Sequence, residues 1–122
     1  MVIDLERLDA SQLPGEVAVT SITMAELAAG PHATRDAAER ARRQDRLQRA
    51  EAAFDPIPFD AAAARAYGRI YAAVVAQGRK ARGARAVDLM IAAVAAAAEL
   101  PLCTRNPDDF SGLEDLVRVV AV

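Results

Sequence analysis

Short runs of β-type residues alternate with longer helical stretches along the chain, and this alternation constrains the fold more than any other feature. The strand-like runs are residues 17–20, 57–59, 102–104 and 117–122, while residues 1–3 form either the end of a strand or a first helical turn. The helical stretches are residues 21–30, 34–53, 61–77 and 85–99. Strands separated by helices favour a parallel sheet covered by helices. The pattern therefore predicts a three-layer α/β/α sandwich built on a parallel sheet.

Length and composition fit one domain of this class. The chain has 122 residues, enough for one core, and no linker or repeat divides it, so we expect a single domain over residues 1–122. A net charge of −2 provides no general basic field for holding nucleic acid. The single cysteine, Cys103, suits a reducing cytosol, and the apolar residues 89–98 are too few to span a bilayer. We therefore expect a cytoplasmic protein without a membrane segment.

One acid lies where a charge is costly. Asp88 interrupts the almost wholly apolar stretch 85–98, and a buried carboxylate needs a cation or hydrogen-bond donors as partners. Glu26 follows the strand 17–20, Asp109 follows the strand 102–104, and Asp88 lies in the first turn of the helix leading into that strand. Ligands of open α/β sheets bind outside the carboxyl ends of the strands. We therefore expect the three acids to reach the same end of the sheet, where they would form a divalent-metal site.

Each of these acids also has a purely structural explanation. Thr23 and Glu26 have the spacing of a capping box, in which the glutamate bonds back to the first amide of the helix. Asp88 would be a first-turn acid favoured by the helix dipole. Asp109 would lie in the first turn of a short helix capped by Asn106. Only the co-location of all three acids favours a site over these explanations.

The cations fall into two groups. The arginines of residues 35–49 are interleaved with acids, which is typical of a solvated, salt-bridged helix face. A second group of four has no acid among its members and lies just before Asp88, so it offers candidates for binding phosphate groups: Arg79, Lys80, Arg82 and Arg85. Arg105 is a fifth candidate. With His32 as the only histidine and one cysteine, a zinc site is not expected.

Three segments together resemble those typical of PIN-domain ribonucleases, in particular the VapC toxins of bacterial type II toxin–antitoxin pairs. They are Ser-Ile-Thr-Met-Ala-Glu-Leu at residues 21–27, Arg-Ala-Val-Asp-Leu-Met-Ile-Ala-Ala at 85–93 and Thr-Arg-Asn-Pro-Asp-Asp-Phe at 104–110. Each is weak alone, but their order and spacing match over nearly the whole chain. The resemblance implies a toxin that cleaves RNA with Mg²⁺ or Mn²⁺ and pairs with an antitoxin. We also expect a homodimer, because a missing first strand would leave a sheet edge to be covered.

The resemblance also implies roles for individual residues. Glu26, Asp88 and Asp109 would be the catalytic, metal-binding acids. Thr104 and Asn106 would support them through hydrogen bonds. The cations that would contact RNA phosphates are Arg79, Lys80, Arg82, Arg85 and Arg105.

The chain departs from the family pattern at its start. Family members open with a hydrophobic strand ending in Asp-Thr or Asp-Ser, whose aspartate is the first metal ligand, whereas residues 1–5 resemble the residues directly after that motif. We therefore expect the first strand to be truncated, and we assign Asp4 no metal role. Two explanations stay open, namely a misassigned start codon and a catalytically impaired chain.

An impaired chain corresponds to an alternative function. It would be a PIN-like binding module that docks an antitoxin or another copy of itself without catalysis. The helical stretches 34–53 and 61–77 would offer apolar surfaces for this purpose, through Leu47, Tyr67, Ile70 and Tyr71.

Overall fold

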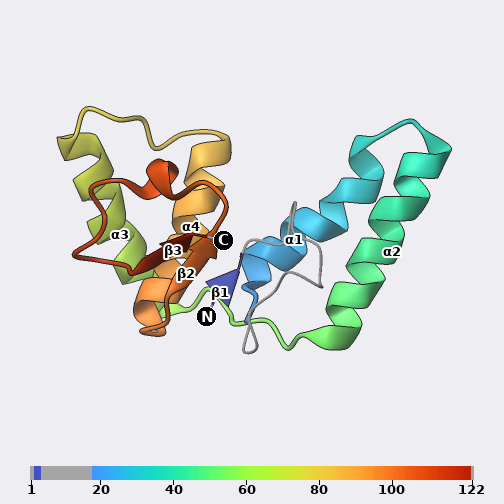
Figure 1. Ribbon diagram of the computed structural model, residues 1–122, viewed down its shortest axis with the longest axis horizontal. Coiled ribbons are helices and arrows are strands. Elements are labelled where there is room, and N and C mark those ends of the chain that lie inside the picture. The colour runs from blue at the N-terminus through green and yellow to red at the C-terminus, as the bar shows by residue number, and fades with distance from the viewer. Residues whose placement is uncertain (1, 4–17, 122) are drawn as a thin grey trace.

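The computed structural model describes residues 2–3 and 18–121 (Figure 1). Its helices are α1 (Ser21–Ala29), η2 (Gly30–Ala33), α2 (Ala37–Ala53), α3 (Ala61–Ala76), α4 (Ala84–Ala97) and η3 (Pro107–Phe110), where η marks a 3₁₀ helix. Its strands are β1 (Val2–Ile3), β2 (Leu102–Thr104) and β3 (Val119–Ala121). The predicted strands 17–20 and 57–59 meet in an isolated parallel bridge between Thr20 and Ile57.

The strands form a parallel sheet in the order β1-β2-β3, which confirms the predicted α/β class. Strand β2 is central, with Leu102 paired to Val2 on one side and to Val119 on the other. The first strand, expected to be truncated, is two residues long where it is described. Asp4 lies outside the described residues.

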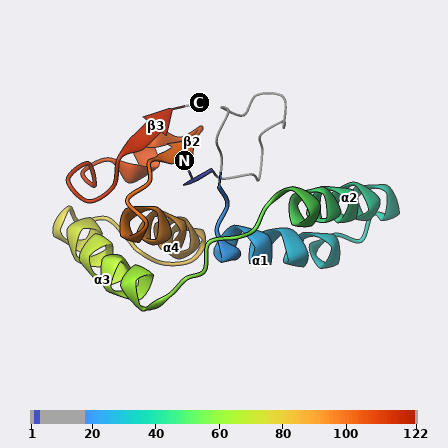
Figure 2. The ribbon, with the colours of Figure 1, turned by 90° about the horizontal axis from the view of Figure 1, so that it is seen from below.

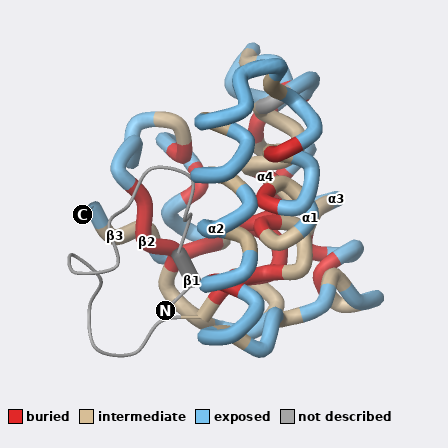
Figure 3. Tube along the Cα trace, turned by 90° about the vertical axis from the view of Figure 1, so that its right-hand side faces the viewer, coloured by how far each residue is buried: buried red, intermediate tan, exposed pale blue. Residues whose placement is uncertain are grey.

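The main core joins α3, α4 and the sheet. Helix α4 lies between the sheet and α3, which packs against its far side (Figure 2). Ile70, Leu89 and Leu102 are each at most 1% exposed and belong to one cluster with Phe110 from η3. Burying a side chain of this size contributes about 1.5–3 kcal/mol, so this cluster is the main support of β2 and of the turn after it. Figure 3 shows the buried residues concentrated around these elements.

Helices α1 and α2 form a hairpin that extends away from the sheet (Figures 1 and 2). Leu27 and Ala50 are buried between them, and the half-buried Met24, Leu47 and Phe54 pack against this smaller cluster. Its remaining buried members, Val19 and Cys103, connect the hairpin to the sheet.

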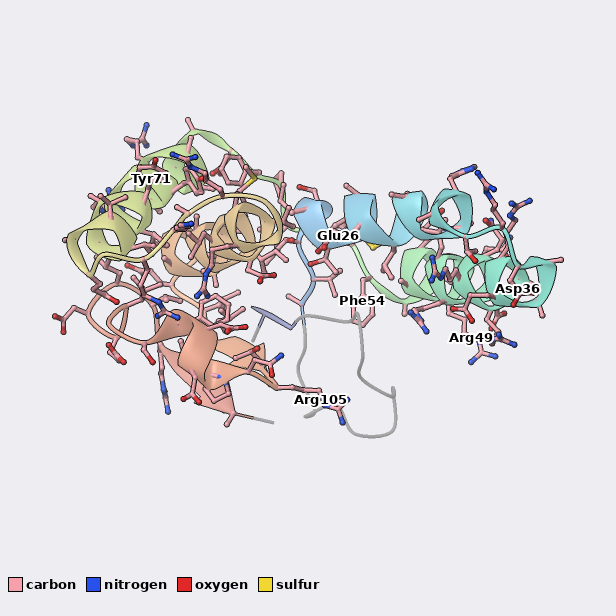
Figure 4. The ribbon with its side chains drawn as sticks, turned by 90° about the horizontal axis from the view of Figure 1, so that it is seen from above. Glu26, Asp36, Arg49, Phe54, Tyr71 and Arg105 are labelled. Atoms are coloured by element: carbon pink, nitrogen blue, oxygen red, sulfur yellow. The ribbon has the colours of Figure 1, made fainter. Side chains whose placement is uncertain are left out.

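The outer face of α2 is salt-bridged, as the sequence predicts. Glu39 pairs with Arg42 at 2.8 Å and with Arg43 at 3.0 Å, and Arg49 pairs with Asp45 at 3.0 Å. The hydrogen bond from Arg42, and to a smaller extent the one from Arg43, holds the pKa of Glu39 below its usual value. Arg49 lies on this helix and Asp36 caps its start, both far from Tyr71 on α3 (Figure 4).

The apolar stripes proposed as docking surfaces are mostly core. Ile70 is 1% exposed, and Leu47 and Tyr67 are half-buried members of the two clusters. Tyr71 differs, since 44% of it is exposed. None of the described helices is both long enough and apolar enough to cross a membrane.

Candidate functional site

Glu26 lies well inside α1. The helix is capped by Thr20, whose Oγ1 accepts a hydrogen bond of 3.0 Å from the amide of Thr23. The amide of Ser21 donates to the carbonyl of Ile57 at 2.9 Å, which fixes where the helix begins. Glu26 is therefore the sixth helical residue, so the capping-box explanation of Glu26 is wrong. Glu26 is half-buried.

Asp88 lies in the second turn of α4, one residue later than expected. The helix begins at Ala84, after Gly83 with its positive φ of 63°, and its first turn contains no acid. The placement in the first turn is therefore wrong, and the dipole explanation weakens because the effect fades beyond the first turn. Asp88 is half-buried and adjoins Leu89, which is 0% exposed.

Asp109 lies on η3, directly beyond the carboxyl end of β2. The amide of Asp109 donates to the carbonyl of Asn106 at 3.1 Å. Asn106 is at the cap position, as predicted, but its side chain makes no capping bond. The hydroxyl of Thr104, which is 5% exposed, accepts a 3.1 Å hydrogen bond from the Asn106 amide. The strand end thus fixes the entry of the turn that carries Asp109.

The three acids come from elements that adjoin one another. Helix α1 packs against α4, and α4 leads through β2 to η3. Figure 4 shows Glu26 near the middle of the molecule, where the hairpin joins the rest. Within residues 2–3 and 18–121, however, no three Asp, Glu, His or Cys side chains lie close enough to hold a metal ion. The donor chemistry suits Mg²⁺ or Mn²⁺, since all three ligands are carboxylates, but their meeting at one ion stays a prediction.

Two of the five candidate phosphate-binding cations, Arg79 and Arg85, donate hydrogen bonds to the turn after β2. Arg79 donates to the carbonyl of Ser111 at 3.3 Å and to that of Asp108 at 3.4 Å. Arg85 donates to the carbonyl of Asp109, and its Nη1 lies 3.9 Å from Oδ1 of the same residue. These partners are 24 to 32 residues apart in sequence, so no local pattern reveals them.

Three other cations are exposed: Lys80, Arg82 and Arg105. Arg105 extends from the end of β2, away from α3 and α4 (Figure 4). Lys80 and Arg82 form no hydrogen bond or ion pair within the part of the chain that the structure describes. The charges of Lys80 and Arg82 are therefore available to an anionic ligand.

Neither His32 nor Cys103 fits a catalytic role. His32 is exposed on η2. Cys103 is 2% exposed, and burial raises the pKa of its thiol, so the reactive thiolate is disfavoured.

This arrangement of helices and sheet is found in a known protein family. A family profile described as "PIN domain" matches residues 3–116. The chain belongs to the PIN-domain family. The match covers all three acids and the five candidate phosphate-binding cations. The resemblance seen in the sequence is thereby confirmed.

Individual PIN-domain relatives agree. The chain is 37% identical to Ribonuclease VapC5 of Mycobacterium tuberculosis over 113 residues, which cover 93% of this chain and 80% of that relative. The crystal structure of VapBC-5 from the same organism, a member of the VapBC family of toxin–antitoxin systems, matches with a TM-score of 0.81 and 35% identity, covering 99% of this chain and 97% of that chain. FitAcB from Neisseria gonorrhoeae shares the fold, with a TM-score of 0.73 at 23% identity, over 98% of this chain and 96% of its own.

Proposed function

We propose that this PIN-domain chain is an endoribonuclease, the toxin of a toxin–antitoxin pair, and that it requires Mg²⁺ or Mn²⁺. The observation that carries the proposal is the 37% identity to Ribonuclease VapC5 over 93% of the chain. The VapBC-5 structure supports an antitoxin as partner. We propose that residues 1–122 act as one domain in the cytoplasm, where RNA and an antitoxin would both be met.

In this proposal, Glu26, Asp88 and Asp109 hold the divalent cation. The proposal is supported by the helix ends, because α1 is capped by Thr20 and Asp88 lies beyond the first turn of α4. When bound, the cation supplies polarisation of a phosphoryl oxygen and a more acidic attacking water. Carboxylates repel one another without a cation between them, so we expect Mn²⁺ to draw these acids closer together.

The exposed cations would bind the RNA backbone beside the acids. Lys80 and Arg82 precede α4, which carries Asp88, and Arg105 lies four residues before Asp109. Binding of this kind weakens as salt is added, because counterions are released from the nucleic acid. Thr104 would act indirectly, through its bond to the Asn106 amide.

The test is RNA cleavage with Mg²⁺ or Mn²⁺ by matched variants. Asp88→Asn and Asp109→Asn are expected to abolish cleavage, and a chelator should do the same to the unsubstituted protein. Asp108→Asn is the control, because Asp108 is the exposed neighbour of Asp109 on the same 3₁₀ helix. Cleavage that persists in Asp88→Asn would refute the assignment of this acid.

A binding module without catalysis is the second candidate. It is favoured by the finding that no three metal-binding side chains cluster among the described residues. Calorimetry with Mn²⁺ separates the two candidates. No heat of binding, together with intact RNA, would favour the module over the nuclease.

We also propose a homodimer formed through the outer face of α3. Tyr71 is 44% exposed and Val75 is 52% exposed, one turn apart on this helix. Light scattering is expected to give the mass of two chains, and Val75→Asp should halve it. A monomer at all concentrations would exclude this interface.

A further inference from the structure

The residues between α3 and α4 are tied to the turn that carries Asp109. We call residues 77–85 the α3–α4 connection and residues 106–112 the acid-bearing turn. Arg79 and Arg85 supply three hydrogen bonds between them, each from a guanidinium to a backbone carbonyl of the turn. A further contact is steric, since a Cβ at Gly112 would lie 2.0 Å from the Nε2 atom of Gln77. The two segments therefore meet along the length of the turn.

The acid-bearing turn has little support of its own. It contains a four-residue 3₁₀ helix without a side-chain cap, and 3₁₀ hydrogen bonds have poorer geometry than those of an α-helix. Phe110 and Leu113 anchor it in the core, but Asp108 and Ser111 are exposed. The backbone around Asp109 is therefore held on the inner side by the core and on the outer side by the two arginines.

Arg85 donates its hydrogen bond to the backbone of Asp109 and not to its carboxylate. Its hydrogen bond goes to the carbonyl of Asp109, while its Nη1 is 3.9 Å from the carboxylate, beyond hydrogen-bond range. The side chain of Arg85 is 23% exposed, whereas that of Asp109 is 48% exposed. Arg85 thus fixes the backbone of the acid and leaves its carboxylate oxygens accessible to a ligand.

We propose that Arg79 and Arg85 are positioning residues that hold the acid-bearing turn, and with it the Asp109 carboxylate, rather than contacts to RNA phosphate. This inference rests on the proposed nuclease function for its catalytic consequence, but the contact itself does not. Arg85 acts on Asp109 directly, and Arg79 acts on the residues that flank it. Phosphate binding then falls to the exposed cations Lys80, Arg82 and Arg105.

The first measurement does not depend on cleavage. Backbone ¹⁵N order parameters of residues 108–111 are expected to fall from about 0.85 towards 0.6 in Arg85→Ala and in Arg79→Ala. Lys80→Ala is the matched control, since it removes an adjacent, exposed cation that forms no hydrogen bond or ion pair with the described residues of the turn. Order parameters that stay unchanged in both arginine variants would overturn the proposal.

The second measurement separates positioning from phosphate binding. A displacement of about 1 Å at a reacting group can cost on the order of 100-fold in rate, so Arg85→Ala should lower kcat by about 10- to 100-fold. KM and the salt dependence of RNA binding should stay as in the unsubstituted protein. Lys80→Ala and Arg82→Ala should show the opposite, with a raised KM and a salt slope reduced by about one.

The outcomes are distinguishable. If Arg85→Ala and Arg79→Ala raise only KM and reduce the salt slope, the arginines bind phosphate and the positioning role is wrong. If Arg85→Ala does not fold, the order parameters and the cleavage kinetics of Arg79→Ala decide the proposal. If the unsubstituted protein cleaves no RNA, the proposed function fails, while the order parameters still decide whether the arginines hold the turn.

Discussion

Arg85 on α4 donates a hydrogen bond to the backbone carbonyl of Asp109, and its Nη1 lies 3.9 Å from Oδ1 of that residue. Arg85 is three residues before Asp88 on the same helix, so one element contributes a predicted metal ligand and a support for another. A shift of α4 would therefore move both acids together. This coupling is a reason to test the residues around the site as well as the acids themselves.

Thr104 should contribute both stability and geometry. Thr104→Val has nearly the same shape but removes the acceptor of the Asn106 amide, which should lower the free energy of unfolding by about 1 kcal/mol. RNA cleavage should fall as well, because the entry of the acid-bearing turn loosens. Urea denaturation and a cleavage assay provide the measurements. Thr104→Ser keeps the hydroxyl and should retain cleavage, so a loss of cleavage in both variants would contradict this role of the hydrogen bond.

Replacing Gly68 or Gly112 by alanine should change the free energy of unfolding in opposite directions. Gly68 is exposed inside α3. Apart from its chain neighbours and the backbone of its own helix, no atom of the described residues lies within 4 Å of a Cβ placed there. Gly68→Ala should therefore raise the free energy of unfolding by about 0.5–1 kcal/mol, because alanine loses less conformational entropy. Gly112 has a φ of +84°, so Gly112→Ala should lower stability by about 1–2 kcal/mol. Thermal unfolding of both variants provides the test.

The contact between Gln77 and Gly112 allows a control for the stability that Gly112→Ala is expected to lose. The clash with a Cβ at Gly112 involves the end of the Gln77 side chain, which is exposed and can rotate away. Gln77→Ala combined with Gly112→Ala should therefore recover little of the lost stability. Full recovery in the double variant would show that the clash, and not the positive φ, carries the cost.

The sequence predicts those features of the fold that local chemistry determines. Asp60 is the cap of α3, as expected, and its Oδ1 accepts a 2.9 Å hydrogen bond from the amide of Ala63 three residues later. The position of Asp60, directly before a helical stretch, is enough for that prediction. The parallel sheet is likewise predictable, since a helix between two short strands leaves few other arrangements.

Long-range contacts determine what the sequence does not predict. The sequence predicts that α1 begins at Ser21 but leaves its cap open. The cap is Thr20, and the Ser21 amide bonds to the carbonyl of Ile57, 36 residues away, so the capping box considered for Thr23 and Glu26 is wrong. The bonds of Arg79 and Arg85 to the acid-bearing turn also join residues far apart in sequence, by 24 to 32 positions. A pattern of cations without acids between them predicts an anion site, but it does not predict that two of those cations bind backbone carbonyls instead.

The ion pairs of α2 should be visible in an acid titration. Glu39 has a lowered pKa because Arg42 and Arg43 bond to its carboxylate. A lowered folded pKa means that the stability from this group is present above its unfolded pKa and is lost as the pH falls through the folded one. The ¹³C shift of the Glu39 carboxyl should therefore titrate below the usual glutamate range.

Arg42→Gln combined with Arg43→Gln provides the control for this titration. The midpoint of Glu39 should then move up towards the ordinary value, because both hydrogen bonds that lower it are removed. A Glu39 midpoint that is the same with and without the arginines would contradict the pairing.

Cys103 should be protected from alkylation in the folded protein. The thiol lies in β2 between Leu102 and Thr104, is 2% exposed, and has a pKa raised by burial, so both access and thiolate formation are disfavoured. If reaction requires global unfolding, it should be slower than in guanidinium by about 10³-fold or more, as measured with a thiol reagent at pH 8. Ala52→Cys in a Cys103→Ala background places a thiol on the exposed side of α2 and should react at the unfolded rate. Rapid labelling of native Cys103 would mean that β2 opens readily, and that the support of the acid-bearing turn is weaker than its packing indicates.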